Sequence, residues 1–267
     1  MDCLGAPRSL HFIPAPSLGR FADKIPHIDA DGFIFDINTT VCSPRDTASR
    51  ENLSNFIRAR RPSKEVVVRI SSPRADTFET DLDFALSLCP DTLFVSKLES
   101  DEEMRFLAGK LQMAETRCGR PLSLFISIES LRGHNRRDSI LNAADCISLY
   151  VVGYEDLSSN MGIVRPSIRE SGPLRRVLEA SIKSAHSAGV PIVDSVSFMY
   201  RPNELAAFRA EVECGKELGL CGKLSVHPNQ IPVIHEVYDR PYRPRVGKIR
   251  TERRQGASSD TASQLSA

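Results

Sequence analysis

Two carboxylates follow apolar runs near the middle of the chain. Glu129 ends the run in FISIES, and Asp156 follows the run in VVGYEDLSSNMG. If these runs are neighbouring parallel strands, two such carboxylates can hold a hard divalent ion through one oxygen each, leaving waters and substrate oxygens to complete an octahedron. Such an ion stabilises an enolate or polarises a carbonyl. Because neither ligand is Cys or His, we expect Mg²⁺, with Mn²⁺ as the alternative, and not Zn²⁺.

Other ionisable side chains end apolar runs in the same manner. Arg69 ends the run in VVVRIS, and its fork of donors can bind a carboxylate or a thioester oxygen; an ion pair with one carboxylate at the rim is the alternative interpretation. The remaining residues in equivalent positions are Asp36, Lys97, Asp194 and His227. Asp194 is a candidate supporting partner for the site. His227 precedes a proline, which favours extended backbone, and we interpret it as a structural hydrogen-bonding residue.

Eight short apolar runs, several of them continuous as in strands covered on both faces, must position these residues. Eight strands that alternate with helical segments are typical of a (β/α)₈ barrel, whose active site lies at the C-terminal ends of its strands. A doubly wound sheet is the alternative, but neither G-x-G-x-x-G nor G-x-x-x-x-G-K-[ST] occurs. We therefore predict an α/β TIM barrel. The runs are 8–14, 31–37, 65–71, 92–98, 122–128, 146–153, 190–196 and 222–227.

Helical periodicity fills the intervals between the runs. One apolar stripe contains Phe78, Leu82 and Ala85, and another contains Met104, Leu107 and Leu111. Acidic or amide residues at Asp101 and Asn203 predict helix starts, because such side chains complement the helix dipole. Glycines at 189 and 219 predict helix ends before the next strand.

Composition and charge place the chain among ordinary globular proteins. It is 41% hydrophobic and 26% charged, with 35 Lys and Arg against 34 Asp and Glu. Residues 242–267 hold six basic and two acidic side chains, a net of +4. The preceding residues therefore carry about −3, which argues against a nucleic-acid-binding body. We predict one domain over 1–241, followed by a basic, then serine-rich, disordered tail over 242–267.

The remaining sequence signals concern the compartment. No run of 18 apolar residues is present, so we expect no membrane span, and the N-terminal MDCLGAPRSLHFIPAP lacks the apolar core of a secretory signal. The seven cysteines are odd in number, widely spaced and never C-x-x-C. We interpret them as reduced thiols of an intracellular protein, cytoplasmic with a mitochondrial location as the alternative.

The ordered segments resemble a known family over about residues 8–241. They are RSLHFIPAP, DGFIFD, VVVRIS, FVSKLES, ISIES followed by Gly133, VVGYEDLSSNMG and GKLSVHPNQI. The last three, in this order and spacing, are the specific ones. The chain resembles the citrate lyase β-subunit-like branch of the HpcH/HpaI aldolase superfamily, whose members are Mg²⁺-dependent TIM barrels acting on acyl-CoA esters.

The resemblance implies roles for individual residues. The metal carboxylates of the family fall on Glu129 and Asp156, and its substrate-orienting arginine falls on Arg69. The lysine of its P-K-x-E-S motif falls on Lys97 in SKLES. We assign Arg69, Lys97 and Asp36 to catalysis, and Arg69 with Arg8 to substrate binding. The expected partner is a small acyl-CoA or 2-keto acid substrate, handled by a homo-oligomer.

Three departures from the family pattern open alternatives. Asp36 is followed by Ile37, Asn38 and Thr39 where the family has x-Glu-Asp, and Ser71 replaces an asparagine. The tail also lacks the composition of the family's C-terminal lid. The first interpretation is a Mg²⁺-dependent carbon–carbon lyase acting through a metal-stabilised enolate. The alternatives are an altered or inactive barrel that retains the metal pocket, and a CoA-independent 2-keto acid aldolase.

Overall fold

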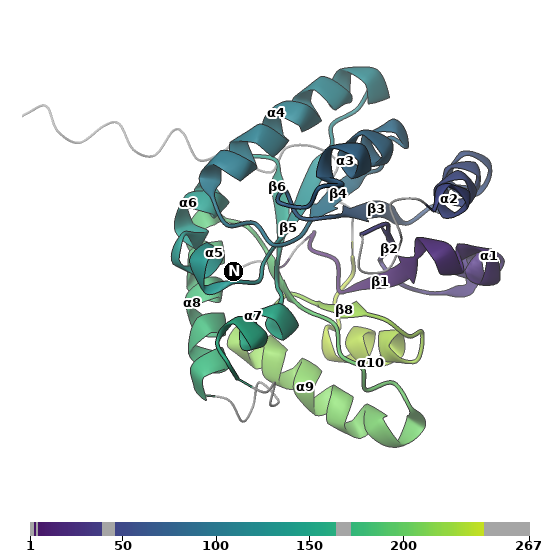
Figure 1. The fold of residues 1–267 in the computed structure, drawn as a ribbon. Coiled ribbons are helices and arrows are strands. Elements are labelled where there is room, and N and C mark those ends of the chain that lie inside the picture. The colour runs from purple at the N-terminus through teal and green to yellow at the C-terminus, as the bar shows by residue number, and fades with distance from the viewer. Residues whose placement is uncertain (1–2, 4, 39–45, 164–171, 243–267) are drawn as a thin grey trace, which may run out of the picture.

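The strands of the computed structural model form one closed parallel barrel. The structure describes residues 3, 5–38, 46–163 and 172–242 (Figure 1). Each strand pairs with the next, and β1 pairs with β8, so the TIM barrel prediction is confirmed. The strands are β1 (Ser9–Pro14), β2 (Gly32–Asp36), β3 (Glu65–Ile70), β4 (Thr92–Val95), β5 (Ser123–Ile128), β6 (Ile147–Val152), β7 (Ile192–Asp194) and β8 (Lys223–Ser225).

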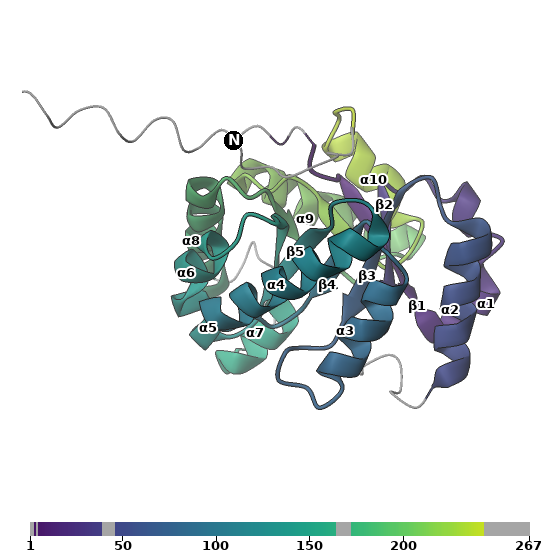
Figure 2. The same cartoon turned by 90° about the horizontal axis from the view of Figure 1, so that it is seen from above.

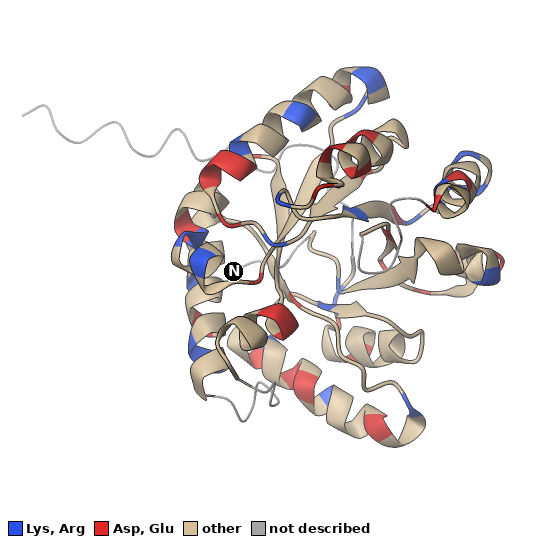
Figure 3. Ribbon diagram, viewed as in Figure 1, with Lys and Arg blue, Asp and Glu red and all other residues tan. Residues whose placement is uncertain are grey.

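Helices surround the barrel in both views (Figures 1 and 2). Acidic and basic residues are both spread over the helices (Figure 3), in keeping with the balanced charge of the chain. The helices are α1 (Leu18–Phe21), α2 (Thr47–Arg60), α3 (Phe78–Ser87), α4 (Asp101–Cys118), α5 (Leu131–Asn135), α6 (Arg137–Asn142), α7 (Tyr154–Asn160), α8 (Gly172–Ala188), α9 (Leu205–Leu218) and α10 (Gln230–Val237), with short 3₁₀ turns at Ala15–Ser17, Ile25–His27 and Pro202–Glu204.

Helix boundaries agree with the capping signals in the sequence. α4 begins at the predicted Asp101, with Ser100 as its N-cap. α9 begins at Leu205, after a 3₁₀ turn that contains the predicted start at Asn203. Gly189 and Gly219 follow the last residues of α8 and α9 with φ of +66° and +104°, a conformation that glycine adopts without steric cost.

Alternation along each strand separates two apolar layers. One cluster fills the barrel interior and includes Leu10, Ile34, Val67 and Phe125. The residues between them, such as Phe33, point outward and pack against the helices. Because side chains alternate faces, residues two positions beyond an interior side chain also face inward. This places Asp36, Arg69 and Glu129 inside the C-terminal mouth.

The opposite, N-terminal end of the barrel is closed by a polar network. Glu65 accepts hydrogen bonds from Thr92 Oγ1 at 2.7 Å and from Tyr242 Oη at 2.8 Å. Burial raises the pKa of this glutamate. Nearby, Arg240 Nη2 donates to the carbonyl oxygens of Ala6 at 2.8 Å and Cys221 at 2.7 Å. The first and last described parts of the chain therefore meet at this end.

The cysteines do not behave as predicted. Disulfides join Cys3 to Cys221 and Cys89 to Cys118, with Cα atoms 5.5 Å apart in each pair, so the prediction of reduced thiols is wrong for these four. Barrel closure brings the segment before β1 beside the residue that precedes β8, which juxtaposes the first pair. Cys146 and Cys214 take part in neither disulfide, and Cys42 lies outside the described residues.

Two further sequence predictions concern the C-terminal tail and membrane spans. Residues 243–267, which make up nearly all of the predicted disordered tail, lie outside it. Among the helices that the structure describes, none has the length and hydrophobicity of a membrane span.

Candidate active site

Arg69 and Asp36 form a two-point ion pair across neighbouring strands. They are register partners on β3 and β2, and Arg69 Nε and Nη2 donate to Asp36 Oδ1 at 3.0 Å and Oδ2 at 2.6 Å. Asn38 donates its backbone N–H to the same Oδ1 at 3.1 Å, and the Arg69 guanidinium lies 5.0 Å from the Phe12 ring centroid. The fork of Arg69 is thus fixed in orientation by its own neighbours.

Glu129 and Asp156 lie together at the mouth. Glu129 directly follows β5, and Asp156 lies in the first turn of α7, just beyond β6. Their carboxyl groups are hydrogen-bonded to each other; burial and this neighbour raise the pKa of Glu129 to about 7. The same hydrogen bond lowers the pKa of Asp156, as does the nearby Lys97 ammonium. Two carboxyl groups that share a proton form a site of concentrated negative charge.

Gly153 provides the room that Glu129 occupies. A Cβ atom at this position would lie 2.7 Å from Glu129 Cδ, closer than real Cβ contacts allow. Gly153 directly follows β6 and is the N-cap of α7, so the glycine lets the neighbouring strand approach the buried carboxyl group. Any side chain at this position would collide with Glu129, which explains the glycine in VVGYED.

Lys97 reaches the same carboxylate pair from the loop that follows β4. Its Nζ lies 2.9 Å from Asp156 Oδ2, and its backbone N–H donates to Ser127 Oγ at 3.3 Å. Ser127 Oγ in turn donates to Glu129 Oε1 at 2.5 Å. The hydroxyl of Ser127 thus connects the loop that carries Lys97 to one of the two carboxyl groups.

The donor set fits a magnesium ion. Glu129 and Asp156 offer oxygen ligands, as Mg²⁺ prefers, and a Mg²⁺ site commonly keeps several waters around one or two carboxylates. In the described residues no cluster of three or more His, Cys, Asp or Glu side chains is suited to hold an ion. With two carboxyl groups the pair is smaller than such a cluster, so waters or substrate oxygens would have to complete the coordination of an ion.

Arg8, predicted to bind substrate, does not lie at this mouth. It precedes β1, at the N-terminal end of the barrel, and its Nε and Nη2 donate to Asp31 at 3.0 and 2.7 Å. Arg8 thus lies at the end of the barrel opposite to Arg69, and its role in substrate binding stays a prediction. The pair of Arg8 with Asp31 joins the entrances of β1 and β2.

Asp194 and His227 also lie apart from the carboxylate pair. Asp194 points outward from β7 and forms a buried ion pair with Lys223, whose Nζ also donates to Glu211 on α9 at 2.8 Å. His227 stacks on Tyr200 with ring centroids 4.8 Å apart. The structural interpretation of His227 is in line with this contact, whereas Asp194 stabilises the packing of α9 on the barrel.

Ser127, Gly153 and Arg74 were not singled out from the sequence. Ser127 stands two residues before Glu129 in ISIE, and strand alternation would have placed both on the interior face. Gly153 is visible only as a glycine at the end of an apolar run. Arg74 donates from Nη2 to the Lys97 carbonyl at 2.7 Å, and no spacing signal in SSPRAD indicates this contact.

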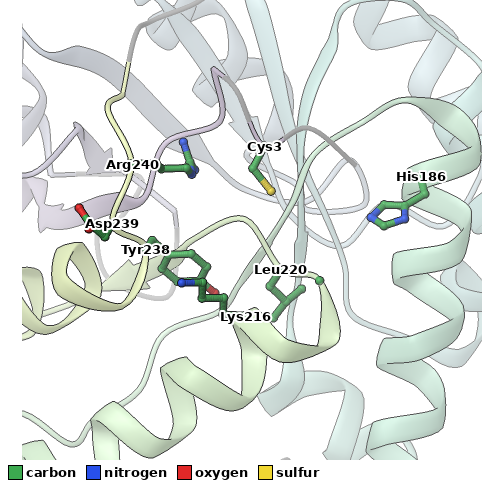
Figure 4. A pocket seen from close by; sticks show the side chains of 8 residues that line it. Cys3, His186, Lys216, Leu220, Tyr238, Asp239 and Arg240 are labelled. Carbon is green, nitrogen blue, oxygen red and sulfur yellow. The ribbon is translucent and has the colours of Figure 1, made fainter.

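A cavity of about 250 Å³ lies away from this site (Figure 4). It is lined by the ends of α8 and α9 and the segment after α10, including His186, Leu220 and Tyr238, with Cys3 on its wall. These residues belong to the N-terminal side of the barrel. The cavity is therefore separate from the carboxylate pair at the mouth.

Comparison with known proteins gives concordant results. The family model described as HpcH/HpaI aldolase/citrate lyase matches residues 8–228. Citrate lyase subunit beta of Escherichia coli (strain K12) is 25% identical over 235 residues, covering 86% of this chain and 76% of the relative. A citrate lyase subunit beta-like protein of Deinococcus radiodurans is 30% identical over 241 residues, covering 86% and 79%. The citrate lyase beta subunit of M. tuberculosis, solved with oxaloacetate and magnesium, has a TM-score of 0.71 at 25% identity, covering 90% of this chain and 100% of the other.

Proposed function

Because this chain belongs to the HpcH/HpaI aldolase/citrate lyase family, we propose that it is a Mg²⁺-dependent carbon–carbon lyase that cleaves or forms a carboxylated acyl-CoA-type substrate. The observation that supports this proposal most is the hydrogen-bonded Glu129–Asp156 pair at the barrel mouth. The M. tuberculosis relative is described as complexed with oxaloacetate and magnesium, which agrees with an oxygen-ligand site and a small oxo acid.

The residues of this chain have distinct parts in the proposed reaction. Glu129 and Asp156 would hold the ion, which supplies positive charge for an enolate when it is bound. Arg69 binds a carboxylate or thioester oxygen of the substrate through its guanidinium, and Asp36 keeps that group in a fixed orientation. Lys97 adds a second positive charge beside the pair. Charges held in place before the reaction stabilise developing negative charge without a reorganisation cost.

Removal of one proposed metal ligand tests this function. Asp156→Ala should lose the Mg²⁺-dependent, EDTA-sensitive activity while the circular dichroism spectrum and melting temperature stay close to the parent. Glu155→Ala is the matched control, because it removes the neighbouring carboxylate in the same turn of α7. Mg²⁺ binding by Asp156→Ala with the affinity of the parent would show that the site is assigned wrongly.

Asn38 favours a second candidate function. It is buried, it donates its backbone N–H to Asp36, and it brings no charge to a position where the family pattern has glutamate. A CoA-independent aldolase acting on a 2-keto acid, or a barrel that keeps the metal pocket with altered chemistry, accommodates this change. A screen of acyl-CoA thioesters against free 2-keto acids, each with Mg²⁺ and with EDTA, separates these functions.

A further inference from the structure

Lys97 has a backbone conformation that disfavours its own side chain. Its φ is +62°, and Cys89 is the other non-glycine residue with positive φ in the described part of the chain. In this region the Cβ of an L-residue crowds its own carbonyl oxygen. Such a conformation persists where the surroundings hold it, and it is concentrated at functional sites.

Hydrogen bonds to two neighbouring segments, the Arg74 loop and β5, hold this conformation. Arg74 Nη2, from the loop between β3 and α3, donates to the Lys97 carbonyl at 2.7 Å. The Lys97 N–H donates to Ser127 Oγ at 3.3 Å, and the N–H of Leu98 donates to the Ser127 carbonyl at 3.0 Å. Arg74 is itself fixed by Glu103 Oε1 at 2.7 Å, so the loop is held from both sides.

This backbone directs the Lys97 ammonium to the carboxylate pair. Its Nζ lies 2.9 Å from Asp156 Oδ2, and the two side chains are 39% and 52% exposed. An ion pair this exposed contributes little stability by itself, so it does not explain a left-handed lysine. The left-handed backbone of Lys97 is explained if the site requires a positive charge beside the two carboxyl groups before a metal ion binds.

We propose that Lys97 is a built-in counter-ion of the Glu129–Asp156 pair, which a divalent ion must displace from Asp156, and that Arg74 is the positioning residue that aims it. The proposal rests on the proposed function, since it takes the pair as the metal site. When both carboxyl groups are ionised, as a metal site requires, they repel each other, and the ammonium offsets that repulsion while the ion is absent. Once displaced, the same ammonium remains beside the site as a charge for substrate oxygens.

The test measures metal affinity instead of activity. Mn²⁺ is titrated into the full chain, and free Mn²⁺ is followed by electron paramagnetic resonance. Lys97→Met should bind Mn²⁺ about fivefold more tightly than the parent, because the ion no longer has to break the Lys97–Asp156 ion pair, and one unit-charge attraction at about 4 Å in a water-like dielectric corresponds to a factor of about five. Lys97→Gln is a second variant without the charge, and Lys97→Arg, which retains it, should stay within about twofold of the parent.

Arg74→Met should shift the affinity in the same direction by a smaller factor, because it releases the carbonyl that fixes the lysine. Arg132→Met is the matched control: Arg132 is another cation of the rim, but it pairs with Glu99 at 3.8 Å and not with the metal candidates. We expect its Mn²⁺ affinity to remain within about twofold of the parent. A merely structural role for Arg74 would lower the melting temperature and leave the affinity unchanged.

The outcomes separate this proposal from the proposed function. Parental or weaker Mn²⁺ affinity in both Lys97→Met and Lys97→Gln, with strong binding by the parent, overturns the counter-ion alone. An unchanged affinity in Arg74→Met overturns the positioning role. Absence of Mn²⁺ binding by the parent, or full binding by Asp156→Ala, overturns the metal site and the counter-ion together.

Discussion

At the scale of single residues, the site depends on space as much as on charge. Glu129 is buried beside Gly153, where no side chain fits. Its carboxyl group is held by Ser127 Oγ at 2.5 Å and shares a proton with Asp156. Small changes at this point should therefore affect metal binding before they affect the fold.

Gly153→Ala should weaken Mn²⁺ binding by tenfold or more, because the added Cβ displaces the Glu129 carboxyl group. Overpacking of this kind costs about 1–3 kcal/mol of stability. Gly109→Ala is the control, since nothing lies within 4 Å of that Cβ in the middle of α4, and it should gain about 0.5–1 kcal/mol. Mn²⁺ titration and urea unfolding measure both effects. Undiminished affinity in Gly153→Ala would contradict the placement of Glu129.

The raised pKa of Glu129 gives the metal-free protein a specific pH dependence. In the folded protein the pKa of this carboxyl group is about 7, against an ordinary value of 4.5. The folded state thus binds the proton more tightly, so this stabilisation is fully present below about pH 4.5 and is lost as the pH rises through 7. The change amounts to about 3 kcal/mol at most. Urea unfolding in EDTA at pH 5 and 7.5 should show it in the parent and not in Glu129→Gln; equal losses in both would rule out Glu129 as the source.

Residue types at strand ends predicted much of the site. Glu129, Asp156, Arg69 and Lys97 follow apolar runs, and parallel strands bring such ends together. Arg8 lies at the opposite end of the barrel because it stands before its strand. Asp194 was misplaced by parity: Val193 faces the interior, so its neighbour faces the helices. The left-handed conformation of Lys97 has no sequence signal, since it depends on contacts from other loops.

At the scale of elements, the helix that follows the Lys97 loop begins with a complete capping box. Ser100 Oγ accepts the Glu103 N–H at 3.2 Å, and Glu103 Oε2 accepts the N–H of Ser100 at 3.3 Å. These bonds satisfy amide groups that the first turn of α4 leaves open. The cap therefore sets where the loop stops and the helix starts.

Ser100→Ala should lower the free energy of unfolding by about 1 kcal/mol, the usual cost of a lost N-cap side chain. Ser87→Ala is the control, because that exposed hydroxyl donates only to the Phe84 carbonyl, and its effect should stay below about 0.5 kcal/mol. Urea unfolding followed by circular dichroism gives both values. Equal stabilities of Ser100→Ala and the parent would mean that the capping bonds carry no net energy.

Strand number and order were predictable, and strand limits less so. The apolar run of residues 190–196 contains only a short strand, Ile192–Asp194. The N–H of Val190 instead bonds to the Ala185 carbonyl at the end of α8. An apolar run indicates which residues are buried. Buried residues extend beyond those that form strand hydrogen bonds, so the run overestimates the length of the strand.

At the scale of the whole molecule, closure of the barrel decides which cysteines meet. Cys3 and Cys221 are 218 residues apart in the chain, and Cys89 and Cys118 are 29 apart. Sequence spacing gave no reason to pair residues so distant. Their proximity follows from the pairing of β1 with β8 and from the neighbouring ends of α3 and α4.

Each disulfide should stabilise the fold according to the loop it closes. Chain entropy predicts about 5 kcal/mol for Cys3–Cys221 and about 3.5 kcal/mol for Cys89–Cys118. Urea unfolding of Cys3→Ser and Cys118→Ser, each with and without a phosphine reductant, measures these contributions. The larger loss should occur in Cys3→Ser. If the reductant leaves the unfolding midpoint of the parent unchanged, the bonds make no contribution to stability.

The meeting of the first and last described parts of the chain at the N-terminal end of the barrel has a practical consequence. Arg240 bonds to the Ala6 carbonyl, and Tyr242 inserts its hydroxyl among the residues that close the N-terminal face. A linker to a bead or an electrode, attached near either of these residues, would hold the molecule by the N-terminal end of its barrel. The C-terminal mouth with Glu129 and Asp156 would then face the solution and not the support. The same chain therefore offers two attachment points for oriented immobilisation, and both leave the end of the barrel with Glu129 and Asp156 uncovered.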